Sequence, residues 1–443
     1  MPSDPVALQK SASRSGGDLV RKGFWAVADQ GLFAGSNAIL NVMLARWLPE
    51  VEYGAFSTAF AAFLLLGVIH TALLTEPMLV FAPERYKGNL RKYMGALLRG
   101  HVVVSLLASL ALVITALVLG HLGQARLAHA MYCFAGSAPF VLFLWLMRRA
   151  CYAQMNPRKA ALAGGGYLVL MMCALAVVHQ LDMLSIATAL AMIGVSSLLA
   201  GVWLTIGTVE VALTDDFIRD VAASHWRYGR WATATQLLGF IPGNVYYFLL
   251  PRLMSLEQSA ALRVLTNLFN PFLQANAALC LLLLPAFVRT RGTAEGKRVH
   301  RLSLLLLAGG PAVYWLFMGL EHRHIIQLFY HGKYMEYSGL IWIIGLQPII
   351  AGMSGVYGSL LRANQKMNAV FWGGFVAAAT AVTLGVMLTI KYGMVGVCWS
   401  IVITYAVHHI TLWLFSRKTV SNMMGASMNE DVRAEMTAEA ELS

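Results

Sequence analysis

The chain alternates long apolar stretches with short polar ones over most of its 443 residues. A helix needs about 20 apolar residues to cross a bilayer. A soluble protein would have to bury every such stretch in one core, beneath a surface built from only 12% charged residues. The pattern predicts an all-α integral membrane protein of twelve transmembrane helices, near 25–46, 54–75, 94–120, 126–147, 160–179, 183–206, 226–250, 260–288, 302–320, 337–361, 368–390 and 393–416.

The basic residues lie mostly on one side of these segments. If the N-terminus is cytoplasmic and the helices alternate in direction, 26 of the 33 lysines and arginines fall at cytoplasmic ends and loops. Lysine and arginine are retained inside during insertion, so the bias supports this topology and an even number of helices. We therefore expect both termini to be cytoplasmic, and we assign the net charge of +12 to the membrane surface rather than to nucleic acid.

A short motif recurs in the two halves of the chain. WAVADQ at 25–30 returns 206 residues later as WATATQ at 231–236, and Arg46 and Arg252 share the same offset. Six helices separate the copies, so both copies run from inside to outside, as in parallel repeats. We predict a cytoplasmic tail at 1–23, six-helix bundles at 24–206 and 226–418, a cytoplasmic linker at 207–225 and a disordered cytoplasmic tail at 419–443.

The first apolar segment contains an acidic residue. Asp29 lies one to two turns from the predicted cytoplasmic face, where a carboxylate is costly unless it is hydrated, paired or protonated. His70 could share a proton with it, and Glu76, before Pro77, is a second candidate. One interpretation is an ion-coupling site for a proton or Na⁺ at Asp29, His70 and Glu76. The other interpretation is structural: His70 is a satisfied interior histidine, and Asp29 pairs with Arg21, Lys22 or Arg99.

Polar side chains form stripes along two predicted helices. The first stripe has spacings of seven and four residues and the second has spacings of four, three and four, so each lies on one helical face. Amides between membrane helices contribute only about 0.6–2 kcal/mol each, so helix contacts are one explanation. The alternative is a polar substrate cavity, lined by Gln30, Asn37 and Asn41 of the first stripe, Arg263, Asn267, Asn270 and Gln274 of the second, and Asn244.

Two proline sites interrupt the seventh and eighth segments. Proline lacks a backbone donor and clashes with the preceding turn, so Pro242-Gly243 and Pro271 predict bends near mid-membrane. Freed carbonyls at that depth are tolerated only against protein or a water-filled cavity. We interpret Pro242, Gly243 and Pro271 as a hinge for alternating access, with a packing irregularity as the alternative.

Several kinds of chemistry are not indicated. The five cysteines lack CxxC spacing, which argues against a metal or disulfide framework. No glycine-rich phosphate loop is present, so ATP and other cofactors are not expected, and an ion gradient or the membrane potential is the expected energy source. The longest outer segment, 321–336, holds three histidines without a ligand or catalytic pattern. The sequence therefore predicts that the chain is not an enzyme.

Three stretches resemble a known superfamily. LARWLPEVEYGAFSTAFA at 44–61 is similar to the connection between helices 1 and 2 of the MOP (multidrug/oligosaccharidyl-lipid/polysaccharide) exporters. IIQLFYHGKYMEYSGLIWIIGLQPII at 325–350 resembles their segment before helix 10, and LLRANQKMNA at 360–369 resembles the turn after it. Tyr53-Gly54 and the short loops look most like the Wzx-type polysaccharide flippases. The second half departs from that pattern, since Ser259-Ala260 stands where the repeat would place Tyr-Gly.

The resemblance implies a fold and a function. It implies two pseudo-symmetric six-helix bundles around a central cavity, in a bacterial inner membrane. The substrate would be an undecaprenyl-diphosphate-linked oligosaccharide, a repeat unit of exopolysaccharide, capsule or O-antigen, flipped from the inner to the outer leaflet. Arg263 would meet the diphosphate late in its passage, so Arg263→Ala should impair flipping more than Arg263→Lys. The expected partners are this substrate and membrane lipids, with a polysaccharide polymerase and glycosyltransferases as further candidates around a monomer.

Two other transporter classes remain open. A MATE-like drug or cation antiporter has the same fold but needs deep acidic residues, and here these are Asp29 and Glu76, while the candidate pathway carries Arg263. A lipid II-type flippase moves a related cargo, but that resemblance usually brings two additional helices. The sequence favours an anionic substrate without deciding among these classes.

Overall fold

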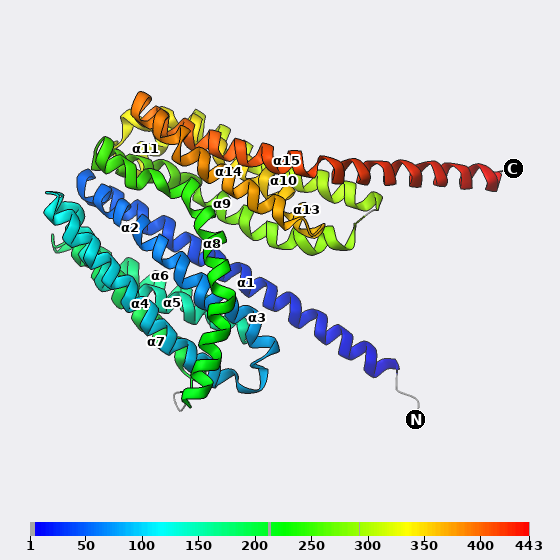
Figure 1. The fold of residues 1–443 in the computed structure, drawn as a ribbon, viewed down its shortest axis with the longest axis horizontal. Helices are drawn as coiled ribbons and strands as arrows, with labels where there is room; N and C mark the ends of the chain where they lie inside the picture. Colours follow the sequence, from blue (N-terminus) through cyan, green and yellow to red (C-terminus); the bar gives the residue numbers. More distant parts are fainter. Residues whose placement is uncertain (1–4, 211–213, 292, 443) are drawn as a thin grey trace. The chain divides into compact units, whose positions relative to one another are not determined.

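The computed structural model describes the backbone of residues 5–210, 214–291 and 293–442, and the side chains of 21–210, 214–291, 293 and 295–417. Within these ranges every regular element is a helix (Figure 1). The chain divides into two compact units, residues 1–237 and 238–443. The boundary between the units falls inside α8 (Asp215–Leu253), so this one helix belongs to both.

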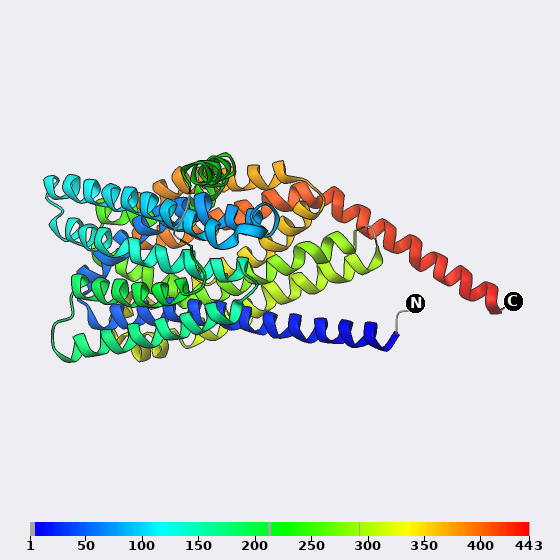
Figure 2. The ribbon, with the colours of Figure 1, turned by 90° about the horizontal axis from the view of Figure 1, so that it is seen from below.

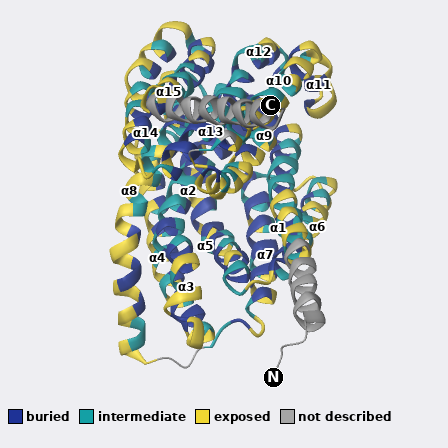
Figure 3. Cartoon of the chain, turned by 90° about the vertical axis from the view of Figure 1, so that its right-hand side faces the viewer, coloured by how far each residue is buried: buried dark blue, intermediate teal, exposed yellow. Residues whose placement is uncertain are grey.

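The first unit is built around α5. This helix packs against α2, α4, α6 and α7, and α1 packs along α6 (Figure 2). Figure 3 shows buried residues on the sides of these helices that face their neighbours and exposed residues on the outward sides. The elements are α1 (Pro5–Trp47), α2 (Glu50–His70), the π-helix η1 (Thr71–Thr75), α3 (Glu76–Glu84), the 3₁₀ turn η2 (Lys87–Asn89), α4 (Leu90–His121), α5 (Ala125–Ala153), α6 (Pro157–Gln180), α7 (Ile186–Thr205) and the first part of α8.

Sequence signals at the helix ends explain several of these boundaries. Asn156 caps α6 through its side chain, and Pro157 occupies the first helical position, where no N–H is needed. Ser185 and Thr188 form a reciprocal capping box at the start of α7. Between α4 and α5, Gly123 has a φ of +77°, which glycine adopts without steric cost. Short loops of this kind place consecutive helices side by side.

The second unit is built around α13, which packs against α9, α10 and α15. Backbones approach closely there, because a Cβ atom at Gly352 would collide with the carbonyl of Leu307. The elements are the second part of α8, α9 (Leu256–Arg289), α10 (Ala294–Leu320), α11 (His322–Tyr330), the 3₁₀ turn η3 (Met335–Leu340), α12 (Ile341–Ile344), α13 (Leu346–Ala363), α14 (Met367–Val382) and α15 (Leu384–Leu442).

The element α15 contains a chain reversal. Gly393 has φ +58° and ψ −136°, which is not helical. Ser400 Oγ donates to the carbonyl of Gly385 at 3.1 Å, although 15 residues separate them. A straight helix would place those residues about 22 Å apart at 1.5 Å per residue. Residues 384–392 therefore continue the span begun by α14, and the next span starts after Gly393, between the segments predicted at 368–390 and 393–416.

All twelve predicted segments fall on helices. Among the described residues, nine helices are long and apolar enough to cross a membrane. α1 and α8 are not among them, and in α1 Asp29 and the amides lower the mean hydropathy. α14 is 16 residues long and gains its remaining length from 384–392. The all-helical membrane fold is confirmed, and the count of twelve stays a prediction.

Helices extend into the predicted linker and into both predicted tails. α8 begins at Asp215, inside the predicted linker 207–225, of which 211–213 lie outside the described residues. α1 already begins at Pro5, and α15 runs to Leu442 through the tail predicted to be disordered. The C-terminal stretch 423–442 is rich in alanine, methionine and glutamate, which favour helix even without an apolar face. The bundle limits 24–206 and 226–418 stay predictions.

Candidate functional site

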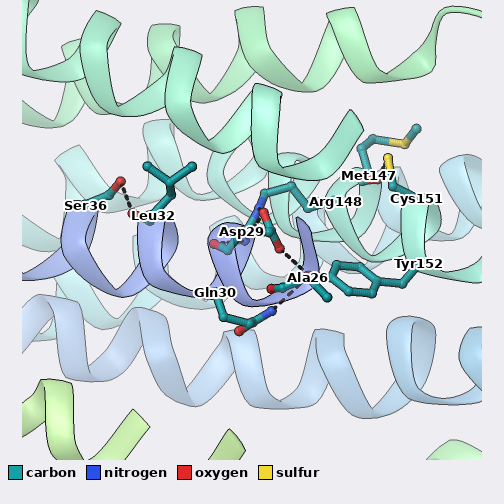
Figure 4. A network of polar contacts seen from close by, with 9 residues as sticks. All are labelled: Ala26, Asp29, Gln30, Leu32, Ser36, Met147, Arg148, Cys151 and Tyr152. Atoms are coloured by element: carbon teal, nitrogen blue, oxygen red, sulfur yellow. Dashed lines mark hydrogen bonds and ion pairs between the residues drawn. The ribbon is translucent and has the colours of Figure 1, made fainter. Parts of the chain in front are cut away.

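A buried ion pair joins α1 to α5 in the first unit. Arg148 Nη2 donates to Asp29 Oδ1 at 2.7 Å, and Arg148 Nε donates to the same oxygen at 3.2 Å. The hydroxyl of Tyr152 donates to Asp29 Oδ2 at 2.7 Å (Figure 4). The Asp29 side chain is fully buried and that of Arg148 is 8% exposed. Both carboxylate oxygens are therefore occupied by donors from one helix.

The neighbouring side chains shape this pair. The guanidinium of Arg148 lies over the ring of Phe33, with its carbon 4.1 Å from the ring centroid. Gly164 of α6 leaves room for it, since a Cβ atom there would lie 3.4 Å from Asp29 Oδ1. Gln30 Nε2 reaches the Tyr152 hydroxyl at 3.4 Å. α1, α5 and α6 together hold the carboxylate and the guanidinium in one orientation.

An aromatic pocket lies on the other side of Phe33. Its cavity is small, about 30 Å³, and lies between α1, α2, α5, α6 and α7. Three polar groups face it, Asn37, Tyr167 and Ser197. Pockets of this composition bind apolar or ring-shaped groups, with a few polar contacts that fix their orientation. The rings that line it are Phe33, Phe56, Phe60, Phe63, Phe134 and Trp145.

The structure separates the three predicted ion-coupling residues. His70 is fully buried, and its Nε2 lies 3.0 Å from Nδ1 of His101 on α4, so one hydrogen lies between the two imidazoles. Glu76 is half-buried at the start of α3. The recorded hydrogen bonds of Asp29 go to Arg148 and Tyr152. Joint ion coupling at Asp29, His70 and Glu76 stays a prediction.

The amides of α1 face different surroundings. Gln30 is exposed, Asn37 lines the aromatic pocket, and Asn41 is buried. Asn41 Nδ2 donates to the carbonyl of Asn37 at 2.8 Å, and its Oδ1 accepts from the Tyr53 hydroxyl at 3.0 Å. Asn41 therefore serves helix packing, while Gln30 contacts Tyr152 and Asn37 lines the pocket. A substrate contact at Gln30 or Asn37 stays a prediction.

The polar stripe of α9 is buried at one end and exposed at the other. Arg263 is 6% exposed and its guanidinium carbon lies 3.9 Å from the centroid of the Tyr247 ring. Asn267 is also buried, while Asn270 is half-buried and Gln274 is exposed. The outer half of the stripe thus lies inside the second unit. A substrate contact at Arg263 stays a prediction, and it would need Tyr247 to move.

The proposed hinge residues lie within continuous helices. α8 runs through Pro242 and Gly243, and α9 runs through Pro271. Asn244, on the same turn, donates from Nδ2 to the carbonyl of Phe240 at 3.1 Å. This carbonyl is also the helical acceptor of the Asn244 backbone N–H, whereas the carbonyl that loses its donor at Pro242 is that of Leu238, four residues earlier. The hinge stays a prediction.

The sequence did not indicate Arg148 as the basic partner of Asp29. Arg148 lies in the last turns of α5, at its predicted cytoplasmic end, four residues before Tyr152 and on the same face. The four-residue spacing of Arg148 and Tyr152 is a usable signal, because it places a cation and a hydroxyl donor on one helix face. A buried carboxylate such as Asp29 needs both kinds of partner. His101 and Phe33 gave no comparable signal, since a single polar or aromatic residue in an apolar helix has many possible neighbours.

Comparison with known proteins adds a family context. No protein-family model matches the chain. The lipopolysaccharide biosynthesis protein WzxC of Escherichia coli (strain K12) is 23% identical over 185 residues, which cover 38% of this chain and 37% of that protein. The match therefore spans little more than a third of the length of this curated relative.

Solved structures match over a much larger part of the chain. The lipid II flippase MurJ in an inward closed conformation has a TM-score of 0.69 at 13% identity, with coverage of 93% of this chain and 91% of that chain. An inward-facing multidrug resistance MATE family transporter has a TM-score of 0.70 at 11% identity, with coverage of 90% and 99%. The chain has the fold of the MOP superfamily.

The likeness in fold agrees with the fold that the sequence resemblance implied. The two solved structures are those of a flippase and of a transporter. A MOP superfamily transporter from Pyrococcus furiosus, with a TM-score of 0.62 at 13% identity and coverage of 92% and 96%, is described as having a binding pocket of reversed polarity. Pocket charge therefore differs among proteins of this fold, and the Asp29–Arg148 pair has to be weighed for this chain by itself.

Proposed function

We propose that the protein flips an undecaprenyl-diphosphate-linked oligosaccharide from the inner to the outer leaflet of a bacterial inner membrane. The observation that carries this proposal is the pairing of Asp29 with Arg148. A cation exporter needs a carboxylate that is free to hold the cation. Here Asp29, the fully buried one of the two candidate acids, is paired with an arginine, while Glu76 is half-buried, so the site next to the aromatic pocket favours a neutral or anionic cargo.

Two further observations support a lipid-linked sugar as the cargo. The sequence match to WzxC is a match to a protein of lipopolysaccharide biosynthesis. The pocket beside Phe33 offers aromatic faces together with the Asn37 amide and the Tyr167 and Ser197 hydroxyls. Sugar rings present both apolar faces and hydroxyl edges, so these groups suit a sugar ring once the pocket, whose cavity is now about 30 Å³, widens.

The ion pair also supplies a mechanism for energy coupling. A proton on Asp29 would remove the negative charge that holds Arg148, and the freed guanidinium could attract a diphosphate. Loss of the proton would restore the pair and release the anion. One charge crossing 100 mV supplies about 2.3 kcal/mol, which is enough to bias such an exchange. The cycle uses the chain's own residues and needs no ATP.

The test is transport by the purified protein in vesicles. We expect an undecaprenyl-diphosphate-linked oligosaccharide on the inner leaflet to become accessible to a sugar-cleaving enzyme on the outside. Lipid II and a cationic dye are tested in parallel under the same proton gradient. Proton-driven dye export without lipid flipping would replace the proposal by a MATE-like antiporter, and movement of lipid II alone would replace it by a lipid II-type flippase.

A further inference from the structure

The cytoplasmic part of α8 exposes a face rich in tryptophan and arginine. Trp226 is 62% exposed and Trp231 is 69% exposed, although both are large apolar side chains. On a helical projection, Arg227 and Arg230 lie between the two tryptophans. Arg230 is also within cation–π distance of the Trp231 ring. We name this surface the Trp–Arg face; its members are Arg219, Trp226, Arg227, Arg230 and Trp231, all exposed.

The opposite side of the same helix is fixed to the first unit. Arg85 pairs with Asp220 and donates to Ser224 Oγ at 3.0 Å, and the Tyr86 hydroxyl donates to Asp220 Oδ2 at 2.9 Å. His225 is buried and hydrogen-bonded on both ring nitrogens, to the Leu73 carbonyl and the Tyr93 hydroxyl. These contacts set the rotation of α8, so the Trp–Arg face points away from α3 and α4.

The charge of the Trp–Arg face is positive. Asp220 projects between Arg227 and Trp231, but its carboxylate is bound by Arg85 and Tyr86 of the first unit. Asp216 shares the face at the start of α8, more than two turns before Trp226. From Arg219 to Trp231 the exposed side therefore presents three guanidinium groups without an unpaired carboxylate.

We propose that the Trp–Arg face binds the headgroup of an anionic phospholipid in the cytoplasmic leaflet. The inference rests on the proposed orientation, in which residues 215–225 are cytoplasmic and α8 enters the bilayer after them. Tryptophan prefers the membrane–water interface, and arginine binds phosphate through a fork of N–H donors. Trp226 and Trp231 would insert at headgroup level, with Arg227 and Arg230 on the phosphate between them.

Several features favour a lipid over other phosphate-bearing ligands. The face follows directly on the apolar part of the same helix, so its depth matches the headgroup layer. It is a convex side of one helix rather than a pocket, which suits a fluid lipid and offers no enclosure for a free ion. Each basic residue near an anionic membrane surface contributes about 1 kcal/mol, so the two central arginines together correspond to about a 30-fold preference for anionic lipid.

The test measures lipid binding by the full-length protein in detergent. Phosphatidylglycerol and phosphatidylcholine are titrated separately while the midpoint of thermal unfolding is recorded. We expect the double variant Arg227→Gln/Arg230→Gln to bind phosphatidylglycerol about 30-fold more weakly, with its response to phosphatidylcholine unchanged. The matched control Arg289→Gln/Arg291→Gln removes the same charge from exposed cytoplasmic positions on and after α9 that no tryptophan flanks, and it should lose much less binding than the double variant of α8.

Fluorescence quenching tests whether the lipid binds next to the two tryptophans. Brominated phosphatidylglycerol should quench tryptophan fluorescence more than brominated phosphatidylcholine, and Trp226→Phe/Trp231→Phe should remove that difference. Equal binding by the arginine variant and the parent would overturn the proposal, as would an equal loss in the control. Stabilisation by inorganic phosphate alone would assign the face to a free anion. Stronger competition by a prenyl diphosphate would assign it to the cargo.

The readout is independent of transport. A protein that binds phosphatidylglycerol at this face but flips no oligosaccharide would sink the proposed function alone. A protein that flips the oligosaccharide but shows no preference for phosphatidylglycerol would sink only the lipid site.

Discussion

At the scale of single residues, variants of the Asp29–Arg148 pair separate an effect on stability from an effect on transport. Removing one member of a buried ion pair leaves an uncompensated charge, which typically costs about 3–5 kcal/mol. We expect Arg148→Met to be destabilised by that amount, because Asp29 is fully buried. The neutral double variant Asp29→Asn/Arg148→Met should regain most of the stability. If Asp29 takes part in coupling, the double variant will insert normally and fail to flip the oligosaccharide.

The matched control for this pair is the next residue. Arg149 is exposed on α5, so Arg149→Met removes the same charge without leaving a buried partner. Its thermal unfolding and its flipping should match those of the parent protein. Normal flipping by the Asp29→Asn/Arg148→Met variant would show that the pair is only a structural contact between α1 and α5.

At the scale of elements, a proline explains how α8 is docked. Pro77 has no N–H for the carbonyl of Leu73 four residues earlier, and the π-helix Thr71–Thr75 precedes it. His225 Nδ1–H donates to that carbonyl at 2.8 Å, so in the neutral ring Nε2 accepts from the Tyr93 hydroxyl at 2.7 Å. Gly229 allows the close approach, because a Cβ atom there would lie 3.0 Å from the Ala72 carbonyl.

This docking makes stability depend on pH. Burial lowers the pKa of His225 from 6.5 to about 4. The unfolded chain therefore binds a proton that the folded chain excludes, and stability falls as the pH drops from 6.5 towards 4, by up to about 3 kcal/mol. Thermal unfolding in detergent across this range measures the slope. We expect His225→Gln to flatten it and the exposed control His324→Gln to leave it unchanged; equal slopes for all three proteins would exclude His225 as the source.

At the scale of the whole molecule, the apolar pattern predicted the helical membrane fold because length and composition alone decide whether a segment can cross a bilayer. It could not tell which apolar residues face lipid. Leu265 looks like an outward residue opposite the stripe of α9, yet it is fully buried, so Leu265→Ala would be a poor neutral control for Arg263. Lipid tails are as apolar as leucine, so a membrane helix has no polar side to mark its exposed face.

The candidate site was predictable only in part. An isolated aspartate in an apolar segment demanded a partner, and the structure supplies Arg148, which is 119 residues away. Sequence spacing reports which residues share one helix face, and it carries no information on which helix lies opposite. The same limit explains the His70–His101 contact and the docking of α8, since each joins helices through side chains distant along the chain.

The bias of basic residues predicts which ends of the helices are cytoplasmic, and the even number of helices between the two repeats predicts that both halves run in the same direction. One labelling experiment tests both predictions. Gly88 and Glu295 follow the second predicted helix of each half, in η2 and in the first turn of α10, and both residues are exposed in the structure. In a cysteine-free background, we expect Gly88→Cys and Glu295→Cys to react with a membrane-impermeant maleimide only after the membrane is permeabilised. Leu122→Cys and Met183→Cys, exposed at predicted outer turns, should react in intact cells. If position 88 were protected and position 295 reacted from outside, the halves would be inverted rather than parallel, and the cytoplasmic assignment of the second half would be wrong.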